Sequence, residues 1–266
     1  MNLMNYIFII VLSLLTTIIF ICSILYSDKK SREPVYMILI ALISGVFTIG
    51  LSLIIGQIIL PNLQVINSGL FSYNTSSVIK ILILALVEEY SKLLVLYLFI
   101  SKNSNFDDIY DGFVYSSLIA LSFAAIETLM YVFSEFDFSS MISLAILRGI
   151  TAVPLHLICG IVMGYYIGIQ KFSWGTSRRI FNLSMSLFIP ALIHFSYNYL
   201  LTKIVLYLSN NSMLIIVMIV FFIPYYIIAI AFIKRTISLN DKFINNVKHK
   251  NLMTKNEYIE ITEKNF

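Results

Sequence analysis

Seven stretches of this 266-residue chain are long and apolar enough to cross a lipid bilayer as α-helices. A transmembrane helix needs about 20 consecutive, mostly apolar residues. Hydrophobic residues make up 59% of the chain and charged residues 12%, whereas a soluble domain is roughly half apolar and a quarter charged. We therefore predict an all-α fold, a polytopic transmembrane helical bundle at residues 1–234 followed by a polar cytoplasmic tail at 235–266. The predicted helices cover residues 3–26, 35–60, 78–101, 112–133, 141–169, 185–207 and 212–234.

Lysine and arginine are distributed unevenly among the predicted loops, and their placement predicts the orientation of the chain. Three basic residues lie in each of the segments 27–34 and 170–184, and the tail is also basic. Because cytoplasmic loops carry the excess of Lys and Arg, we expect the N-terminus outside and the C-terminus in the cytoplasm. The net charge of +4 is then explained by topology and by attraction to anionic lipids, and no nucleic-acid partner is expected. The loops expected outside contain no basic residue: 61–77, 134–140 and 208–211.

The predicted third helix carries ionisable residues, in the stretch "EEYSK" at 88–92. An ionisable side chain at the centre of a membrane helix costs roughly 2.5–3.5 kcal/mol on insertion scales. Lys92 is three and four residues after Glu89 and Glu88, so either carboxylate can pair with it on one helix face. An ion pair accounts for one glutamate only. The second carboxylate suggests a general acid or base, because burial raises the pKa of a carboxyl group towards the range that suits proton transfer.

Further polar residues occur inside three other predicted helices. With alternating helix directions, Glu127, His156 and His194 fall at depths similar to that of Glu88 and Glu89, from the middle to the outer half of the bilayer core. A single buried histidine is more often a satisfied core residue than a ligand, but agreement in depth among four helices predicts a hydrated intramembrane site. Three neighbours are expected to support it: Lys92, Arg148 and Asn198.

Such a site can hydrolyse a peptide bond in two ways. Carboxylates and imidazoles bind zinc or another divalent metal, here through Glu89, Glu127, His156 and His194. Without a metal, a glutamate can activate water while an imidazole, Asn198 or Arg148 stabilises the oxyanion. The zinc signature HExxH is missing, so the residues alone leave metal dependence open. Gly160, Gly164 and Gly168 form a stripe of small residues that predicts close helix packing.

Four ordered motifs, together with "SREP" before them, resemble the PrsW family of intramembrane proteases, which are distantly related to the CAAX prenyl proteases. "EEYSK" is similar to that family's EExxK, and "DGFVYSSLIALSFAAIETLMY" at 111–131 is similar to its D-G-x-x-Y and Glu-containing segment. "RGITAVPLHLICGIVMGYYIG" at 148–168, "PALIHFSYN" at 190–198 and "SREP" at 31–34 complete the resemblance. The chain departs from the family pattern at Ser116, Ser117, Ser122 and Thr128, which affects fine packing geometry.

The resemblance implies a substrate class and a location. It implies the first, extracytoplasmic-side cut in a single-pass anti-sigma factor of the bacterial plasma membrane, with release of a sigma factor under envelope stress. The candidate site comprises Glu88, Glu89, Glu127, His156 and His194, with Glu88 and Glu89 expected to bind and activate the water.

Two functions of other classes remain open from the sequence. A proton- or ion-coupled transporter can use a relay of buried Glu and His residues, although the broken helices and inverted repeats of transporters are not apparent. A non-catalytic membrane receptor or scaffold would give no reason to retain three glutamates and two histidines at one depth.

Overall fold

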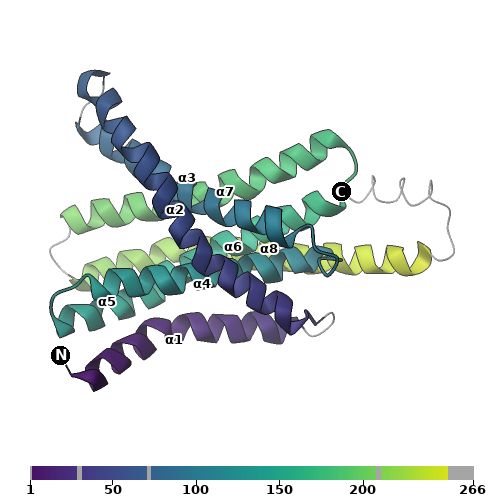
Figure 1. Ribbon diagram of the computed structural model, residues 1–266, viewed down its shortest axis with the longest axis horizontal. Helices are drawn as coiled ribbons and strands as arrows, with labels where there is room; N and C mark the ends of the chain where they lie inside the picture. The colour runs from purple at the N-terminus through teal and green to yellow at the C-terminus, as the bar shows by residue number, and fades with distance from the viewer. Residues whose placement is uncertain (1, 29–31, 71–72, 208–210, 251–266) are drawn as a thin grey trace.

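The computed structural model describes residues 2–28, 32–70, 73–207 and 211–250, and within these ranges all regular structure is helical. Long apolar segments form helices because a backbone inside lipid can satisfy its N–H and C=O groups only internally. Figure 1 shows most of the helices running side by side along the long axis of the molecule. The elements are α1 (Leu3–Ser27), α2 (Val35–Leu70), α3 (Tyr73–Val95), the short π-helix η1 (Leu96–Ile100), α4 (Ile109–Phe133), α5 (Phe138–Ile150), α6 (Ala152–Phe172), α7 (Thr176–Tyr207) and α8 (Asn211–Lys250).

Five described segments are long and apolar enough to cross a membrane. One of them joins two helices, α5 and α6, over Phe138–Phe172. The chain is thus a multi-pass membrane protein with the predicted all-α class. The other four segments are Leu3–Ser27, Val35–Ile59, Ile109–Phe133 and Thr176–Thr202.

The single helix predicted at 141–169 is divided in two, which corrects the sequence prediction. The α-helix α5 ends at Ile150, and α6 begins at Ala152. Pro154 is the cause, since it has no N–H for the carbonyl of Ile150 and its ring would clash with that carbonyl in a continuous helix. Proline is tolerated in the first turn of α6, where N–H groups have no intrahelical acceptor. Thr151 lies at the break, with its hydroxyl 3.0 Å from that of Tyr197.

Other helix boundaries also differ from the prediction. Helix α8 continues to Lys250, so residues 235–250 of the predicted tail are helical; the rest of that tail lies outside the described residues. Helix α2 extends to Leu70 and α7 begins at Thr176, so much of the loops predicted at 61–77 and 170–184 is helix. Polar residues are tolerated in these extensions because a helix can continue past the hydrocarbon into the headgroup region.

Helix α4 is the centre of the bundle and is buried over most of its length. It contacts α6 closely, as the glycine stripe predicts. A Cβ atom on Gly164 would lie 2.2 Å from the backbone oxygen of Gly112, and one on Gly168 would lie 2.4 Å from the backbone oxygen of Ile109. Only glycine permits this approach, which fixes α6, and hence His156, against α4.

Helices α4 and α8 are joined at the start of α4. Asp108 caps α4 and forms a capping box with Asp111. Asn240 of α8 accepts hydrogen bonds from the backbone N–H groups of Ile109 and Tyr110 and donates one to Asp108. These bonds satisfy orphan donors at the start of α4 and join α8 to it.

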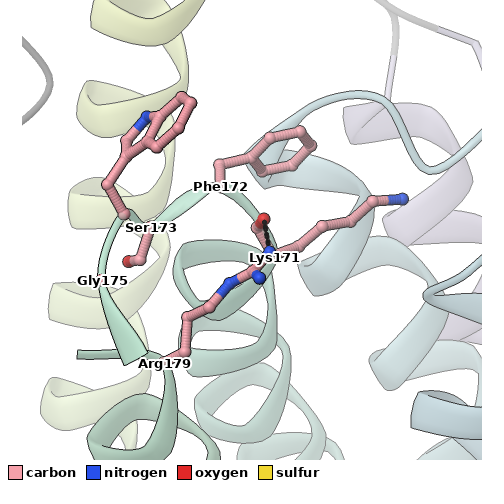
Figure 2. A pocket seen from close by; sticks show the side chains of 6 residues that line it. Lys171, Phe172, Ser173, Gly175 and Arg179 are labelled. Atoms are coloured by element: carbon pink, nitrogen blue, oxygen red, sulfur yellow. Dashed lines mark hydrogen bonds between the residues drawn. The ribbon is translucent and has the colours of Figure 1, made fainter. Parts of the chain in front are cut away.

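A small pocket of about 250 Å³ lies at the turn between α6 and α7 (Figure 2). Gly175 has a φ of +87°, which allows the tight turn. The ammonium of Lys171 donates to the carbonyls of Asn103 and Phe106, and Arg179 donates to the carbonyl of Lys171. These cations therefore satisfy backbone carbonyl groups near the turn.

Candidate active site

A cavity of about 620 Å³ opens in the part of the bundle expected to face the outer leaflet. Figure 1 shows α2 and α3 leaving the bundle at a steep angle on this side. The walls of the cavity are mainly apolar, but six of the polar residues predicted from the sequence line it. These six residues come from five helices: Glu88, Glu127, Arg148, His156, His194 and Asn198. The other two predicted residues, Glu89 and Lys92, are completely buried behind the wall.

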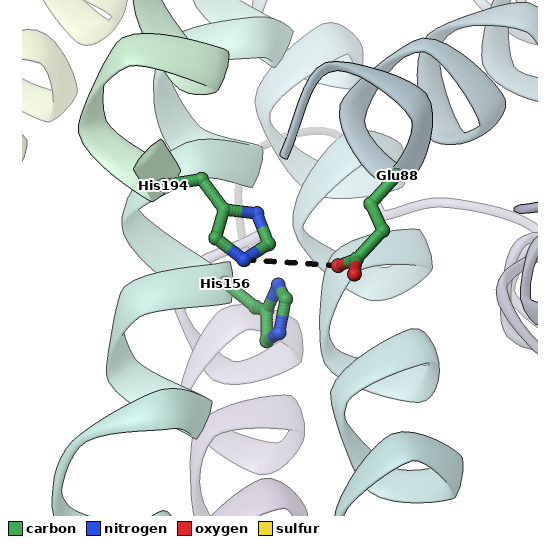
Figure 3. A group of neighbouring side chains, drawn as sticks. All are labelled: Glu88, His156 and His194. Carbon is green, nitrogen blue, oxygen red and sulfur yellow. Dashed lines mark ion pairs between the residues drawn. The ribbon is translucent and has the colours of Figure 1, made fainter. Parts of the chain in front are cut away.

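Glu88, His156 and His194 converge at one point in this cavity (Figure 3). Each offers one ligand atom, and the three atoms lie within 4.8 Å of one another. Nε2 of His194 is 3.7 Å from Oε2 of Glu88. The two imidazole rings meet edge to face, with centroids 4.9 Å apart. Three helices, α3, α6 and α7, thus bring one carboxylate and two imidazoles together.

Glu89 and Lys92 hold these imidazoles from behind. Oε1 of Glu89 lies 2.8 Å from both the Lys92 ammonium and Nδ1 of His194. Since a carboxylate accepts, Nδ1 of His194 carries the proton and Nε2 presents its lone pair towards Glu88. The Lys92 ammonium also lies 2.9 Å from Nδ1 of His156. The adjacent glutamates of "EEYSK" therefore differ: Glu88 faces the cavity, and Glu89 orients a histidine.

Glu127 connects His156 to Arg148. Its Oε2 lies 2.9 Å from Nε2 of His156 and 2.6 Å from a guanidinium nitrogen of Arg148. Arg148 also donates to the Thr128 hydroxyl at 3.2 Å and lies over the ring of Tyr131. Arg148 and His156 belong to separate helices, yet both reach the same carboxylate.

Phe123 is a residue of the site that was not among the predicted ones. The centroid of its ring is 4.0 Å from the Lys92 ammonium and 5.2 Å from the ring centroid of His156. A cation over an aromatic face is attracted by the ring quadrupole, and more strongly where water is excluded. Phe123 lies one helical turn before Glu127, so spacing on the same face was the available signal.

The donors fit a divalent metal. Oε2 of Glu88 is buried and has no hydrogen-bond partner among the described residues. Leaving such an atom unsatisfied costs about 1–3 kcal/mol, and a metal ion would remove that cost. Two imidazoles with one carboxylate are a zinc donor set that leaves a position for water. The Glu89–His194 contact is the carboxylate–histidine arrangement that orients metal ligands.

A second group of carboxylates, Asp107, Asp108 and Asp111, lies at the N-terminal end of α4. Its oxygens already accept backbone N–H groups: Asp111 accepts from Asp107 and Asp108, and Asp108 accepts from Asp111. Helix capping therefore explains this group.

Comparison with known proteins identifies the family. The model of the PrsW family intramembrane metalloproteases matches residues 33–228. A protein named Protease PrsW from Clostridioides difficile (strain 630) is 33% identical over 174 residues, which are 65% of this chain and 71% of that protein. Its namesake from Oceanobacillus iheyensis is 31% identical over 67% of this chain and 76% of that protein. The protein of the same name from Bacillus subtilis (strain 168) is 30% identical over 66% of this chain and 75% of that protein.

No solved structure matches the chain. The matched region contains all eight residues of the predicted site, from Glu88 to Asn198. The comparisons do not favour the transporter alternative, because both the family description and the names of the relatives specify a protease. The chain belongs to the PrsW family of intramembrane metalloproteases.

Proposed function

We propose that this intramembrane protease makes the first, extracytoplasmic-side cut in a single-pass anti-sigma factor, which leads to release of a sigma factor under envelope stress. The observation that carries the proposal is the apolar cavity with carboxylates and imidazoles on its wall. Apolar walls suit a membrane-spanning peptide, and the polar groups suit hydrolysis of its backbone. The predicted orientation places the cavity in the outer half of the bilayer.

Glu88, His156 and His194 are the residues that would hold a divalent metal such as zinc. When bound, such an ion lowers the pKa of its water towards 7 and polarises a carbonyl oxygen. Glu89 holds the proton on Nδ1 of His194 and so keeps Nε2 available. Lys92 balances the charge of Glu89 and donates to Nδ1 of His156, so Nε2 of His156, once deprotonated, would be its ligand atom.

We also assign proton transfer to Glu88, which would offer one carboxylate oxygen to the metal and keep the other for the proton. Glu88 lines the cavity, whereas Oε2 of Glu127 is held by Arg148 and His156 and Glu89 is buried behind the wall. The water oxygen bonds to the scissile carbonyl carbon, and its proton passes to Glu88. Glu88 then protonates the leaving nitrogen as the C–N bond breaks. Asn198 lines the same cavity and can donate its amide N–H to the developing oxyanion.

Co-expression with a tagged single-pass anti-sigma factor tests this proposal. Wild-type protein should yield a shortened substrate, and Glu88→Gln and His194→Ala should not. Asp137→Asn is the matched control, because it also converts a carboxylate to an amide but lies outside the cavity lining. Continued production of the same fragment by Glu88→Gln would refute the assignment.

A further inference from the structure

Glu135 lies at the outer end of the active-site cavity. It follows the last residue of α4, Phe133, by two positions, and it lines the cavity together with Glu127 and Tyr131 of the same helix. Six of the eight positions from Glu127 to Glu135 lie in α4 and span about 9 Å at 1.5 Å per residue, and the last two extend past its end, so the separation is about 9–12 Å. Glu135 is therefore well away from the reacting groups but belongs to the same cavity.

Glu135 has no basic side chain beside it among the described residues, whereas the other two carboxylates of this cavity each lie within 4 Å of one. Arg148 and His156 balance Glu127, and His194 faces Glu88. No ion pair or side-chain hydrogen bond joins Glu135 to any other residue in the described ranges. The mouth of the cavity thus carries a net negative charge that a ligand can meet.

Local structure gives no reason for a carboxylate at this position. The carbonyl end of a helix carries a partial negative charge, so an acidic side chain just after α4 is electrostatically unfavourable. Asp137, two residues later, has a structural role, because its side chain accepts the backbone N–H of Ser140 and caps α5. Hydrogen bonds from Ser140 hold the pKa of Asp137 below its usual value. Glu135 has no such capping contact.

We propose that Glu135 is a specificity residue that binds a lysine or arginine side chain on the extracytoplasmic flank of the substrate. This inference rests on the proposed function. Extracytoplasmic flanks of membrane proteins contain few basic residues, so a cation there distinguishes a substrate from most other single-pass proteins. An extended chain rises about 3.3 Å per residue, so the basic residue lies about four positions outward from the scissile bond.

A series of synthetic single-pass peptides tests the proposal. Mass spectrometry of the fragments first locates the cut. Each peptide then carries lysine, glutamine or glutamate at one of the six positions on the outer side of that cut. The full-length protein is reconstituted in phosphatidylglycerol vesicles, whose headgroups contain no amine. Wild-type protein should cleave the lysine peptide with kcat/KM about five- to tenfold above that of the glutamine peptide, with the largest effect near the fourth position.

Two variants and a control make the result specific. Glu135→Gln should abolish the preference, and Glu135→Lys should reverse it in favour of the glutamate peptide. Asp137→Asn removes an equal charge from the same loop and retains the cap, so it should leave the preference intact. An equal loss of preference in Asp137→Asn, or none in Glu135→Gln, would overturn the proposal.

A binding measurement separates this inference from the proposed function. Labelled lysine and glutamine peptides are titrated against Glu88→Gln protein and against the same variant that also carries Glu135→Gln. The inference is supported if the lysine peptide binds five- to tenfold more tightly than the glutamine peptide only when Glu135 is present. If that preference is seen but wild-type protein cleaves no peptide, the proposed function fails and the inference stands. Equal Kd values for the two peptides, together with cleavage by wild-type protein, would refute the inference alone.

Discussion

Nδ1 of His194 lies 2.8 Å from Oε1 of Glu89, at a position where both side chains are almost completely buried. The contact fixes the tautomer of the histidine and turns Nε2 towards the cavity. Glu89 accordingly acts through His194, and Glu88 is the glutamate that faces the cavity.

Glu89→Gln should lower zinc affinity by about 10- to 100-fold, the usual effect of removing a carboxylate behind a histidine ligand. The measurement is a competitive zinc titration of the purified protein with a fluorescent chelator. His194→Ala is the positive control, because it removes the ligand itself. An unchanged zinc Kd in Glu89→Gln would contradict the orienting role.

Much of this site could be predicted from sequence, because polar residues are costly in a hydrocarbon helix and therefore stand out. The expected depths of Glu127, His156 and His194 agree, and the structure brings all three to one cavity. Sequence could not separate the roles of Glu88 and Glu89. Adjacent residues on a helix point about 100° apart, and only the packing of α7 against α3 decides which glutamate faces the cavity and which is buried behind His194.

The prediction of the fold was limited by residues whose effect depends on context. The seven apolar runs gave the membrane class and most helices. Pro154 was read as part of a continuous helix, although the structure has a break three residues before it. The contact of Asn240 with the start of α4 joins residues about 130 positions apart, and no local pattern encodes it.

Lys92→Met should destabilise the protein by about 3–5 kcal/mol, the cost of leaving the buried Glu89 carboxylate without its cation. Adding Glu89→Gln should restore part of this loss, since the amide carries no charge. Chemical unfolding of the purified protein in detergent micelles measures the free energies. If the double variant is less stable than Lys92→Met, the buried charge is not the cause.

Gly164→Ala should strongly destabilise the bundle, because the added Cβ would lie 2.2 Å from the backbone oxygen of Gly112. The two helices would have to separate, with loss of packing worth roughly 1–3 kcal/mol. Gly50→Ala is the matched control within α2, where a Cβ meets nothing within 4 Å. It should leave stability unchanged or raise it by about 0.5–1 kcal/mol. Equal melting temperatures for the two variants would contradict the close packing.

Stability should decrease as the pH rises from about 4 to about 6 because of Asp28. Burial between α1 and α2 raises the pKa of this carboxyl from 3.8 to about 6. The hydrogen bond from the backbone N–H of Glu33 and the charge of Arg32 oppose this rise, and repulsion from Glu33 and Asp108 adds to it. In this range the folded state holds a proton that the unfolded state has lost, so the added stability is complete below pH 4 and lost by pH 6.

Melting temperatures of wild-type protein and Asp28→Asn, measured between pH 4 and pH 7, test this expectation. The amide oxygen can still accept the backbone N–H of Glu33, which Asp28 binds at 3.1 Å. The variant should show a shallower pH dependence. Parallel curves for the two proteins would exclude Asp28 as a source of the slope.

Cleavage by the purified protein in vesicles tests the central claim most directly. Wild-type protein is expected to cut a single-pass peptide within the outer half of its membrane segment, as shown by the masses of both fragments. A chelator should stop the reaction and added zinc should restore it, whereas Glu88→Gln should remain inactive with zinc present. The same two fragments produced by Glu88→Gln at the wild-type rate would contradict the account.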